Sequence, residues 1–205
     1  MLATKLAIDP AANSPSDSYK LMIGAIVPRP IGFISTVSPD GTHNLAPFSF
    51  FTAICSDPPV VCFASGARNP PKDTLSNARA TGEFVVNIVT EEIAEQMNLC
   101  AGDYPANTDE FVVSRLTPVA SDLVRPPCVL ESPVNMECKV LQVVDVSTRP
   151  AGGSLVIGEV VRFHVDSSIV ANFRIDPEKL RAIGRMGGSG YTRTRDRFEM
   201  ARPRK

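Results

Sequence analysis

The sequence lacks the features that mark several classes of protein. No apolar run approaches the roughly 20 residues that a membrane-spanning helix needs. Residues 1–17 have no apolar stretch of the kind found in a signal peptide. The formal net charge is only −1, which gives no overall attraction to nucleic acid or to anionic lipid. These absences favour a cytoplasmic protein that binds neither a membrane nor nucleic acid.

Residues that bind metals or form disulfides are also few. The five cysteines are odd in number, no pair has Cys-x-x-Cys spacing, and the only histidines are His43 and His164. This pattern excludes the usual zinc arrangements and a regular disulfide framework, so we predict no metal site and reduced cysteines. Alternation along a strand places His164 on the same face as Arg162, and a solvent-exposed histidine is favoured there over a catalytic one.

Nucleotide-binding and hydrolase motifs are missing as well. The chain has no G-x-G-x-x-G after a strand, no G-x-x-x-x-G-K-[ST] and no G-x-S-x-G. A classical Rossmann-type dinucleotide site is therefore not expected. A barrel can still hold a cofactor if its loops and strand edges supply hydrogen-bond donors.

What the chain does contain is proline and glycine, at eighteen and thirteen residues, which favours short strands and many turns. We expect one strand-rich α+β domain over residues 18–205, after a loose N-terminal arm at 1–17. The expected strands are 31–37, 44–54, 60–64, 84–89, 134–146 and 155–165, and the expected helices are 71–80, 91–99 and 176–181. Pro47 should place part of its strand at an edge or a bulge.

Residues 65–74 are the best candidate for binding a phosphate. A glycine-containing loop leaves a strand and runs directly into a helix start, where free backbone N–H groups favour an anion. Arg68, Lys72 and Thr74 add side-chain donors. An ordinary helix start with two solvated bases fits the same residues, and the residues alone leave both interpretations open.

A second candidate combines residues 30–37 with residues 44–51. Ser35, Thr36, Asn44 and Ser49 place small polar groups among bulky apolar ones, which suits a planar ring with polar edges. The residues alone favour an ordinary hairpin with a phenylalanine core. The basic run at 191–205 is expected to be solvated, although Phe198 and Met200 could anchor it to a partner.

Taken together, the motifs resemble those of the flavin-reductase-like family of FMN-binding split barrels. The resemblance extends from about Tyr19 to Pro203 and depends on the order and number of motifs rather than on any single one. The motifs are V27-P-R-P-I31 leading to S35-T-V-S-P-D-G41, N44-L-A-P-F-S-F-F51, S56-D-P-P59, K72-D-T-L75, A80-T-G-E-F-V-V-N87 and G158-E-V160.

The resemblance implies a fold, a cofactor and a set of contacts. It implies a dimeric, antiparallel six-stranded split β-barrel with short flanking helices, which holds FMN, or FAD in some members, near the subunit interface. By motif, Ser35 and Thr36 would meet the flavin, and Asn44, Ser49 and Phe50 would lie at the edge of its ring. The residues expected at the phosphate end are Arg68, Lys72, Asp73 and Thr74, with Arg185 and Tyr191 as further contacts.

The implied activity is transfer of electrons from NAD(P)H to flavin, with reduced flavin serving a partner monooxygenase or another acceptor. No catalytic side chain is identified, because the cofactor carries this chemistry. Several family members have Gly-Asp-His where this chain has Gly158-Glu159-Val160, and that histidine is linked with the nicotinamide side of the site. The alternatives are therefore a flavoredoxin-like FMN carrier without direct NAD(P)H use and, with a poorer motif fit, a pyridoxamine-phosphate-oxidase-like enzyme.

Overall fold

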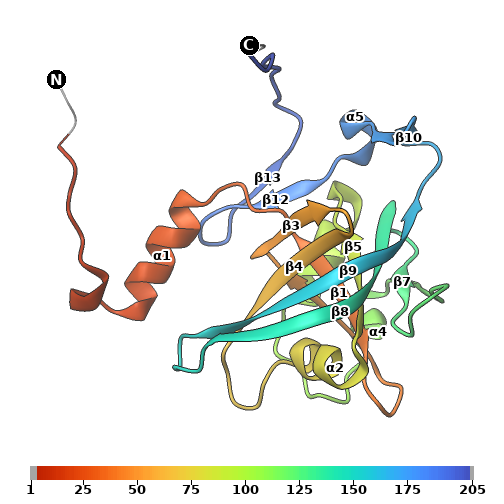
Figure 1. Cartoon of the computed structure of the whole chain (residues 1–205), viewed down its shortest axis with the longest axis horizontal. Coiled ribbons are helices and arrows are strands. Elements are labelled where there is room, and N and C mark those ends of the chain that lie inside the picture. The colour runs from red at the N-terminus through yellow and green to blue at the C-terminus, as the bar shows by residue number, and fades with distance from the viewer. Residues whose placement is uncertain (1–3, 204–205) are drawn as a thin grey trace.

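One antiparallel sheet of seven strands forms the body of the protein in the computed structural model, which describes residues 4–203 (Figure 1). The long hairpin β8–β9 runs through the middle of this sheet. The strand order is β2-β1-β5-β8-β9-β4-β3. The bounds are β1 Gly32–Val37, β2 His43–Phe48, β3 Phe51–Ser56, β4 Pro59–Gly66, β5 Glu83–Ile88, β8 Val134–Ser147 and β9 Gly153–Val165. The expected antiparallel, mainly β architecture is confirmed.

The expected count of six strands is wrong because residues 44–54 do not form one strand. The chain breaks at Ser49 and Phe50, and the two halves become β2 and β3 at opposite edges of the sheet. Since the two edge strands follow one another in the chain, the sheet must curl to bring its edges together. Pro47 lies in β2, so the prediction that it marks an edge strand is confirmed.

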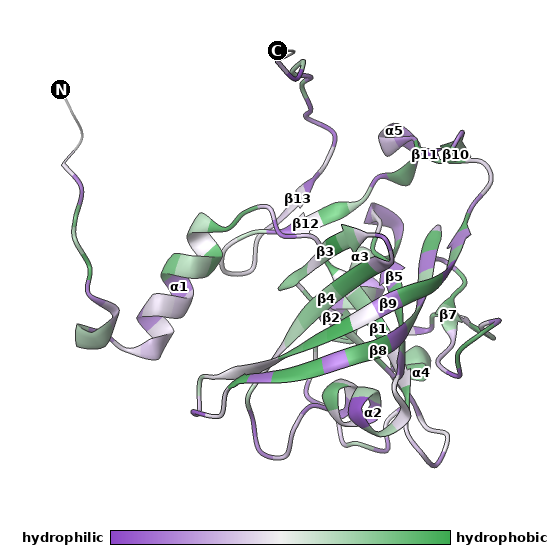
Figure 2. Cartoon of the chain, viewed as in Figure 1, coloured by the Kyte–Doolittle hydropathy of each residue, from purple (hydrophilic) through white to green (hydrophobic). Residues whose placement is uncertain are grey.

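Apolar side chains from the strands on both halves of the curled sheet fill the barrel interior. Phe63 packs between Phe48 and Phe84, with ring centroids 4.8 and 5.3 Å away. Gly158 leaves room for this packing, because a Cβ there would lie 2.4 Å from the Phe84 ring. Helix α2 (Asp73–Thr81) contributes Leu75 and Ala78 to the same cluster. Figure 2 shows the hydrophobic residues running along these strands.

A second apolar layer covers the outer face of β1, β2 and β5. Phe33 and Leu45 point outward from their strands and are fully buried by it. The covering segments are η2 (Glu91–Ile93), α3 (Ala94–Leu99), α4 (Glu110–Ser114) and β7 (Cys128–Val129). The exposed strand β6 (Pro118–Val119) pairs with β7. This side of the barrel is therefore buried on both of its faces.

The C-terminal segment folds back over this layer. Its elements are β10 (Val170–Ala171), β11 (Arg174–Ile175), α5 (Pro177–Leu180), β12 (Ile183–Arg185) and β13 (Tyr191–Arg193). Arg193 and Arg195 both donate hydrogen bonds to Glu91. This part of the basic run therefore packs on the domain, whereas a solvated run was expected. Phe198 and Met200 remain 84% and 81% exposed, and Arg204 and Lys205 lie outside the described residues.

The N-terminal segment leads away from the barrel (Figure 1). It contains η1 (Pro10–Ala12) and helix α1 (Pro15–Ala25), which starts two residues before the expected end of the arm; residues 1–3 of that arm lie outside the described residues. Ser14 caps α1 by accepting the Asp17 N–H. Among the described residues, no helix is long and apolar enough to cross a membrane.

Candidate functional site

The start of helix α2 is built as the sequence predicted. Strand β4 ends at Gly66, and the loop that follows reaches the helix at Asp73. Lys72 is the N-cap residue and makes no side-chain cap, so the first-turn N–H groups have no partner from the N-cap side chain. These groups carry the positive end of the helix dipole and suit a phosphate.

A buried polar network fixes this helix start to the barrel. Asn44 Oδ1 accepts from Thr74 Oγ1 at 2.7 Å and from Thr36 Oγ1 at 3.1 Å, and Thr36 Oγ1 accepts from Asn77 Nδ2 at 3.1 Å. The structure therefore brings together three of the predicted site residues, Thr36, Asn44 and Thr74. Because all three are buried and bonded to one another, they hold the helix start in place.

Glu110 completes the network and was not identified from the sequence. Both of its oxygens accept from Asn44 Nδ2 at 3.1 Å, and Oε2 also accepts from the Leu45 N–H at 3.0 Å. Burial raises the pKa of Glu110 above its ordinary value, although these hydrogen bonds oppose the rise. No local pattern signals this role, because Glu110 lies 66 residues from Asn44.

Two features of the end of β4 and of the loop that follows it bear on an anion. Ser65 Oγ is the single buried side-chain oxygen or nitrogen without a hydrogen-bond partner among the described residues. Alternation along β4 places Ser65 on the inner face with Phe63. Arg68 is exposed and bonds Asp103 at 2.7 Å, whereas half-buried Lys72 has no carboxylate within 4 Å in the described chain. Of the two predicted cations, Lys72 is therefore the one without an ion-pair partner among the described residues, and its ammonium group is available to bind an anion.

Ser49 and Phe50 form the corner between β2 and β3. Phe50 is 41% exposed, and Ser49 Oγ accepts from Arg29 Nε at 3.3 Å. Arg29 is only 4% exposed, and its guanidinium also donates to the carbonyls of Ile23, Ile26 and Met186. The sequence motif contains Arg29, but its role as the link between this corner, α1 and the C-terminal segment was not predicted.

Arg185 and Tyr191 face each other across the β12–β13 hairpin, with the guanidinium carbon 4.4 Å from the ring centroid. Tyr191 lines a cavity of about 500 Å³ together with Asn98, Leu99 and Ile183. Backbone bonds between Arg29 and Arg185, at 2.8 and 2.9 Å, join this hairpin to the strand that leads into β1. A second cavity, of about 520 Å³, contains none of the predicted site residues.

The remaining predicted residues have different surroundings. Ser35 is fully buried; its hydroxyl donates to the Pro127 carbonyl at 2.5 Å and accepts from Asn87 at 3.3 Å. Asp73 is half-buried in the first turn of α2. Val160 lies in the barrel interior. His164 is not the free surface histidine that was favoured, because its side chain is 35% exposed and its Nε2 lies 2.6 Å from Glu137 Oε1.

Comparison with known proteins identifies the family. The flavin reductase like domain matches residues 23–177, so the chain belongs to the flavin reductase-like family. A protein of Aquifex aeolicus is 40% identical over 178 residues, covering 85% of this chain and 89% of its own length. The family assignment is thereby confirmed. A solved structure from Shewanella frigidimarina that is named as having a split barrel domain superposes with a TM-score of 0.82 at 22% identity, covering 94% of this chain and 96% of its own, which confirms the split-barrel type of fold.

Two solved structures are similar over almost the whole chain. Nitrilotriacetate monooxygenase component B from Bacillus cereus superposes with a TM-score of 0.93 at 34% identity, covering 97% of this chain and 100% of its own. The 2-nitrobenzoate 2-nitroreductase of Pseudomonas fluorescens has a TM-score of 0.88 at 30% identity, with 97% and 96% covered. One of these similar structures is thus named as a component of a monooxygenase and the other as a nitroreductase.

Proposed function

We propose that this protein binds FMN and acts as a flavin reductase, passing electrons from NAD(P)H to the flavin. The observation that carries the proposal is the start of α2, where uncapped N–H groups and Lys72 offer a site for a phosphate in a chain of this family. The unpartnered Ser65 hydroxyl, near the end of the strand that precedes this loop, supports the same assignment. When bound, the flavin supplies reversible hydride and electron transfer.

In this proposal the protein binds and orients the cofactor. Lys72, Asp73 and Thr74, with Arg68 at the rim, hold the phosphate end. Ser49 and Phe50 lie at the edge of the ring, in a corner that buried Arg29 keeps rigid. The buried residues Asn44, Thr36 and Ser35 do not contact the cofactor in this proposal but position the residues that do. The stacked pair Arg185 and Tyr191 adds a contact surface on the C-terminal hairpin.

We further propose a homodimer in the cytoplasm. Strand β3 is a sheet edge with five exposed residues, and a second subunit would cover it. All five cysteines are free, as expected in a reducing compartment. Since the relative from Bacillus cereus is named as a monooxygenase component, a partner monooxygenase is the acceptor that we propose first.

One absorbance experiment tests the activity. Purified protein should be yellow or become yellow on addition of FMN, and NADH or NADPH should bleach the flavin band. A yellow protein that neither nicotinamide bleaches would instead support a flavoredoxin-like carrier, the alternative that Val160 raised in the Gly158-Glu159-Val160 motif. A folded protein that binds no flavin in an equilibrium titration contradicts both functions.

The phosphate end is tested with Lys72→Ala and Arg68→Ala. Because Arg68 is exposed and already bonds Asp103, its loss should cost about 1 kcal/mol of FMN binding or less. Loss of the half-buried Lys72 side chain should cost more FMN binding free energy, towards the roughly 2–5 kcal/mol typical of a desolvated charged contact. Riboflavin, which has no phosphate, should bind both variants like the wild type, and Lys139→Ala is the matched surface control. Equal losses of FMN and riboflavin would place these residues outside the phosphate site.

A further inference from the structure

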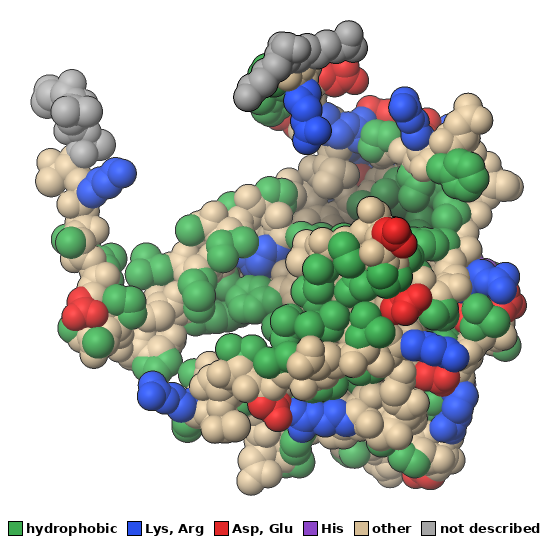
Figure 3. Space-filling model, viewed as in Figure 1, with side chains coloured by type: hydrophobic (Ala, Val, Ile, Leu, Met, Phe, Trp, Pro, Cys, Tyr) green, Lys and Arg blue, Asp and Glu red, His purple; other side chains and the backbone are tan. Residues whose placement is uncertain are grey.

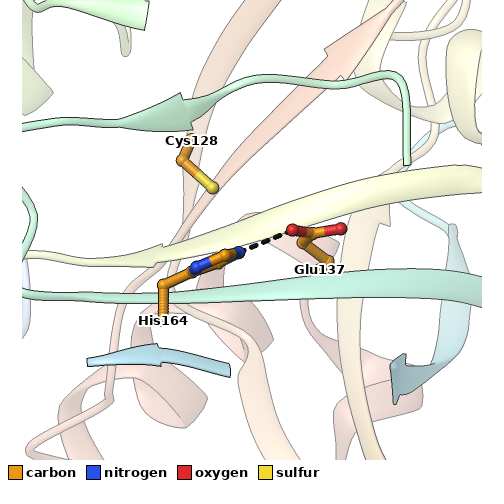
Figure 4. A group of neighbouring side chains, drawn as sticks. All are labelled: Cys128, Glu137 and His164. Atoms are coloured by element: carbon orange, nitrogen blue, oxygen red, sulfur yellow. Dashed lines mark hydrogen bonds and ion pairs between the residues drawn. The ribbon is translucent and has the colours of Figure 1, made fainter. Parts of the chain in front are cut away.

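Three side chains of metal-ligating type converge on the outer face of the sheet, outside the proposed flavin site. Cys128 comes from β7, Glu137 from β8 and His164 from β9, and one ligand atom of each lies within 4.8 Å of the other two. Figure 4 shows the thiol, the carboxylate and the imidazole pointing toward one another. The three residues are too far apart in the chain to form a recognisable motif, so no sequence pattern indicates the group.

The sheet register explains why they meet. Glu137 pairs with Arg162 and Cys138 with Val160, which leaves Val161 as an extra residue in a β-bulge. Beyond the bulge, Arg162 and His164 share the outer face with Glu137. His164 is paired with Asn135, and it reaches Glu137 along the diagonal of the ladder.

Glu137 is a buried carboxylate without a basic partner other than this histidine. Its side chain has no exposed area, and among the described residues no lysine or arginine lies within 4 Å of it. Oε1 accepts from the Asp122 N–H at 2.8 Å, and Oε2 accepts from the Leu123 N–H at 2.7 Å. Each oxygen has two lone pairs, so Oε2 retains one. A carboxylate that is both buried and oriented in this way is well placed to bind a cation.

Cys128 provides the thiol of the group. The residue is 6% exposed, and its Sγ has one weak contact, with Ser121 Oγ at 3.6 Å. Burial raises the pKa of the thiol, and the charges of Glu137 and Asp122 raise it further. A divalent cation would reverse this balance, because it offsets the negative charges and displaces the thiol proton.

We propose that Cys128, Glu137 and His164 form a binding site for a divalent metal ion of the zinc type. A thiolate with an imidazole selects zinc over Mg²⁺ or Ca²⁺, which prefer oxygen ligands. Bonds of about 2 Å at tetrahedral angles set nitrogen and oxygen ligands roughly 3.3 Å apart, so the imidazole must move by less than about 1 Å from its place beside Oε1. His164 is the most exposed of the three residues, at 35% of its side chain, so we expect water to supply the fourth ligand.

The test is metal binding by the purified protein after treatment with a chelator. Calorimetric titration should show one equivalent of Zn²⁺ bound per chain. Co²⁺, used as a spectroscopic probe, should give a thiolate-to-cobalt absorption band in the difference spectrum. Binding should release protons and tighten as the pH rises, because the thiol must ionise. Absence of saturable Zn²⁺ binding in the wild type would overturn the proposal and leave the cluster as a hydrogen-bonded anchor for residues 121–128.

Variants locate the metal. Loss of an outer-sphere partner alone typically weakens metal binding about 10- to 100-fold, so His164→Gln and Cys128→Ser should each weaken it at least tenfold. Cys128→Ser should also remove the cobalt band. His43→Gln is a matched control, because His43 is 34% exposed and lies 3.5 Å from Asp109; Cys55→Ser controls for the exposed thiol. Because His164 lies partly in solvent, its variant should fold even if Cys128→Ser does not. Equal binding by His164→Gln and wild type would refute the assignment.

Discussion

Strands β1 and β3 are alike in sequence and opposite in environment. Each has six residues with a similar mixture of apolar and hydroxyl side chains, Gly-Phe-Ile-Ser-Thr-Val and Phe-Thr-Ala-Ile-Cys-Ser. All six residues of β1 are buried, whereas five of β3 are exposed and the sixth is half-buried. The composition of a strand therefore does not decide its burial. The neighbours of the strand in the sheet and the segments that cover it do.

The side of the sheet formed by β1, β2 and β5 is covered by other segments of the chain, and the side at β3 is open. Residues 91–133 provide helices and loops over the outer face of β1, β2 and β5. No described segment pairs with the free edge of β3. Along β8, Leu141 and Val146 are 53% and 70% exposed. Figure 3 shows apolar side chains gathered on this open face. Such a surface is typical of an interaction site.

The largest expected difference between the two strands comes from Phe33→Ala in β1. Phe33 has no exposed area and packs in the outer cluster, so its truncation should lower the free energy of unfolding by about 3–5 kcal/mol. Ile54→Ala in β3 removes a side chain that is 51% exposed in the single chain and should cost the monomer less than about 1 kcal/mol. Urea unfolding at equal protein concentration measures both. Similar losses would show that β3 is covered in solution.

The next effect concerns Ser35 on the same strand. Ser35→Ala leaves the buried Pro127 carbonyl without its hydrogen-bond donor, which should cost about 1–3 kcal/mol of stability, whereas the Asn87 amide keeps its bond to the Phe33 carbonyl. Unfolding of flavin-free protein measures this directly. If stability is unchanged while FMN affinity falls, Ser35 contacts the flavin itself, as the family motif implied.

The buried carboxylate of Glu137 makes the stability of the covered side depend on pH. Burial favours protonation of Glu137, but hydrogen bonds from His164 and from the Asp122 and Leu123 N–H groups outweigh it, and the pKa lies below the ordinary value. The resulting stability is present above pH of about 4.3, where the unfolded carboxyl ionises, and is lost as the pH falls through the folded pKa. Glu137→Gln should cost about 1–3 kcal/mol at pH 7 and less near pH 3. A constant difference across that range would contradict this account.

Much of the fold could be predicted from the sequence, because strands, turns and helix starts are local patterns. Hydrophobic runs gave β1, β4, β5 and the β8–β9 hairpin within a few residues, and the glycine–proline loop gave the start of α2. The corner at Ser49 was missed because residues 44–54 stay apolar throughout, and their division depends on the curl of the sheet. Alternation along the strand correctly placed His164 and Arg162 on the same face, but it carries no information about a segment that packs over that face.

The same limit applies to the candidate site. Residue types and motifs indicated Thr36, Asn44 and Thr74, yet their partner Glu110 is joined to them only by tertiary contact. Arg29 was visible as a motif residue, but its four acceptors come from three separate parts of the chain. Buried polar networks must satisfy every member. For that reason they are specified by the whole fold and not by a window of sequence.

The smallest expected effect on chain stability comes from placing a charge on β3. Ile54→Lys changes an exposed side chain and should alter the free energy of unfolding of the monomer by no more than about 0.5 kcal/mol. If a second subunit covers β3, the buried lysine should weaken the dimer and shift sedimentation towards the 22.1 kDa chain. Leu130→Lys is the matched control, because Leu130 is 63% exposed on the covered side. Dimers that tolerate Ile54→Lys but dissociate with Leu130→Lys would place the interface over residues 91–133 and reverse the assignment of the two sides.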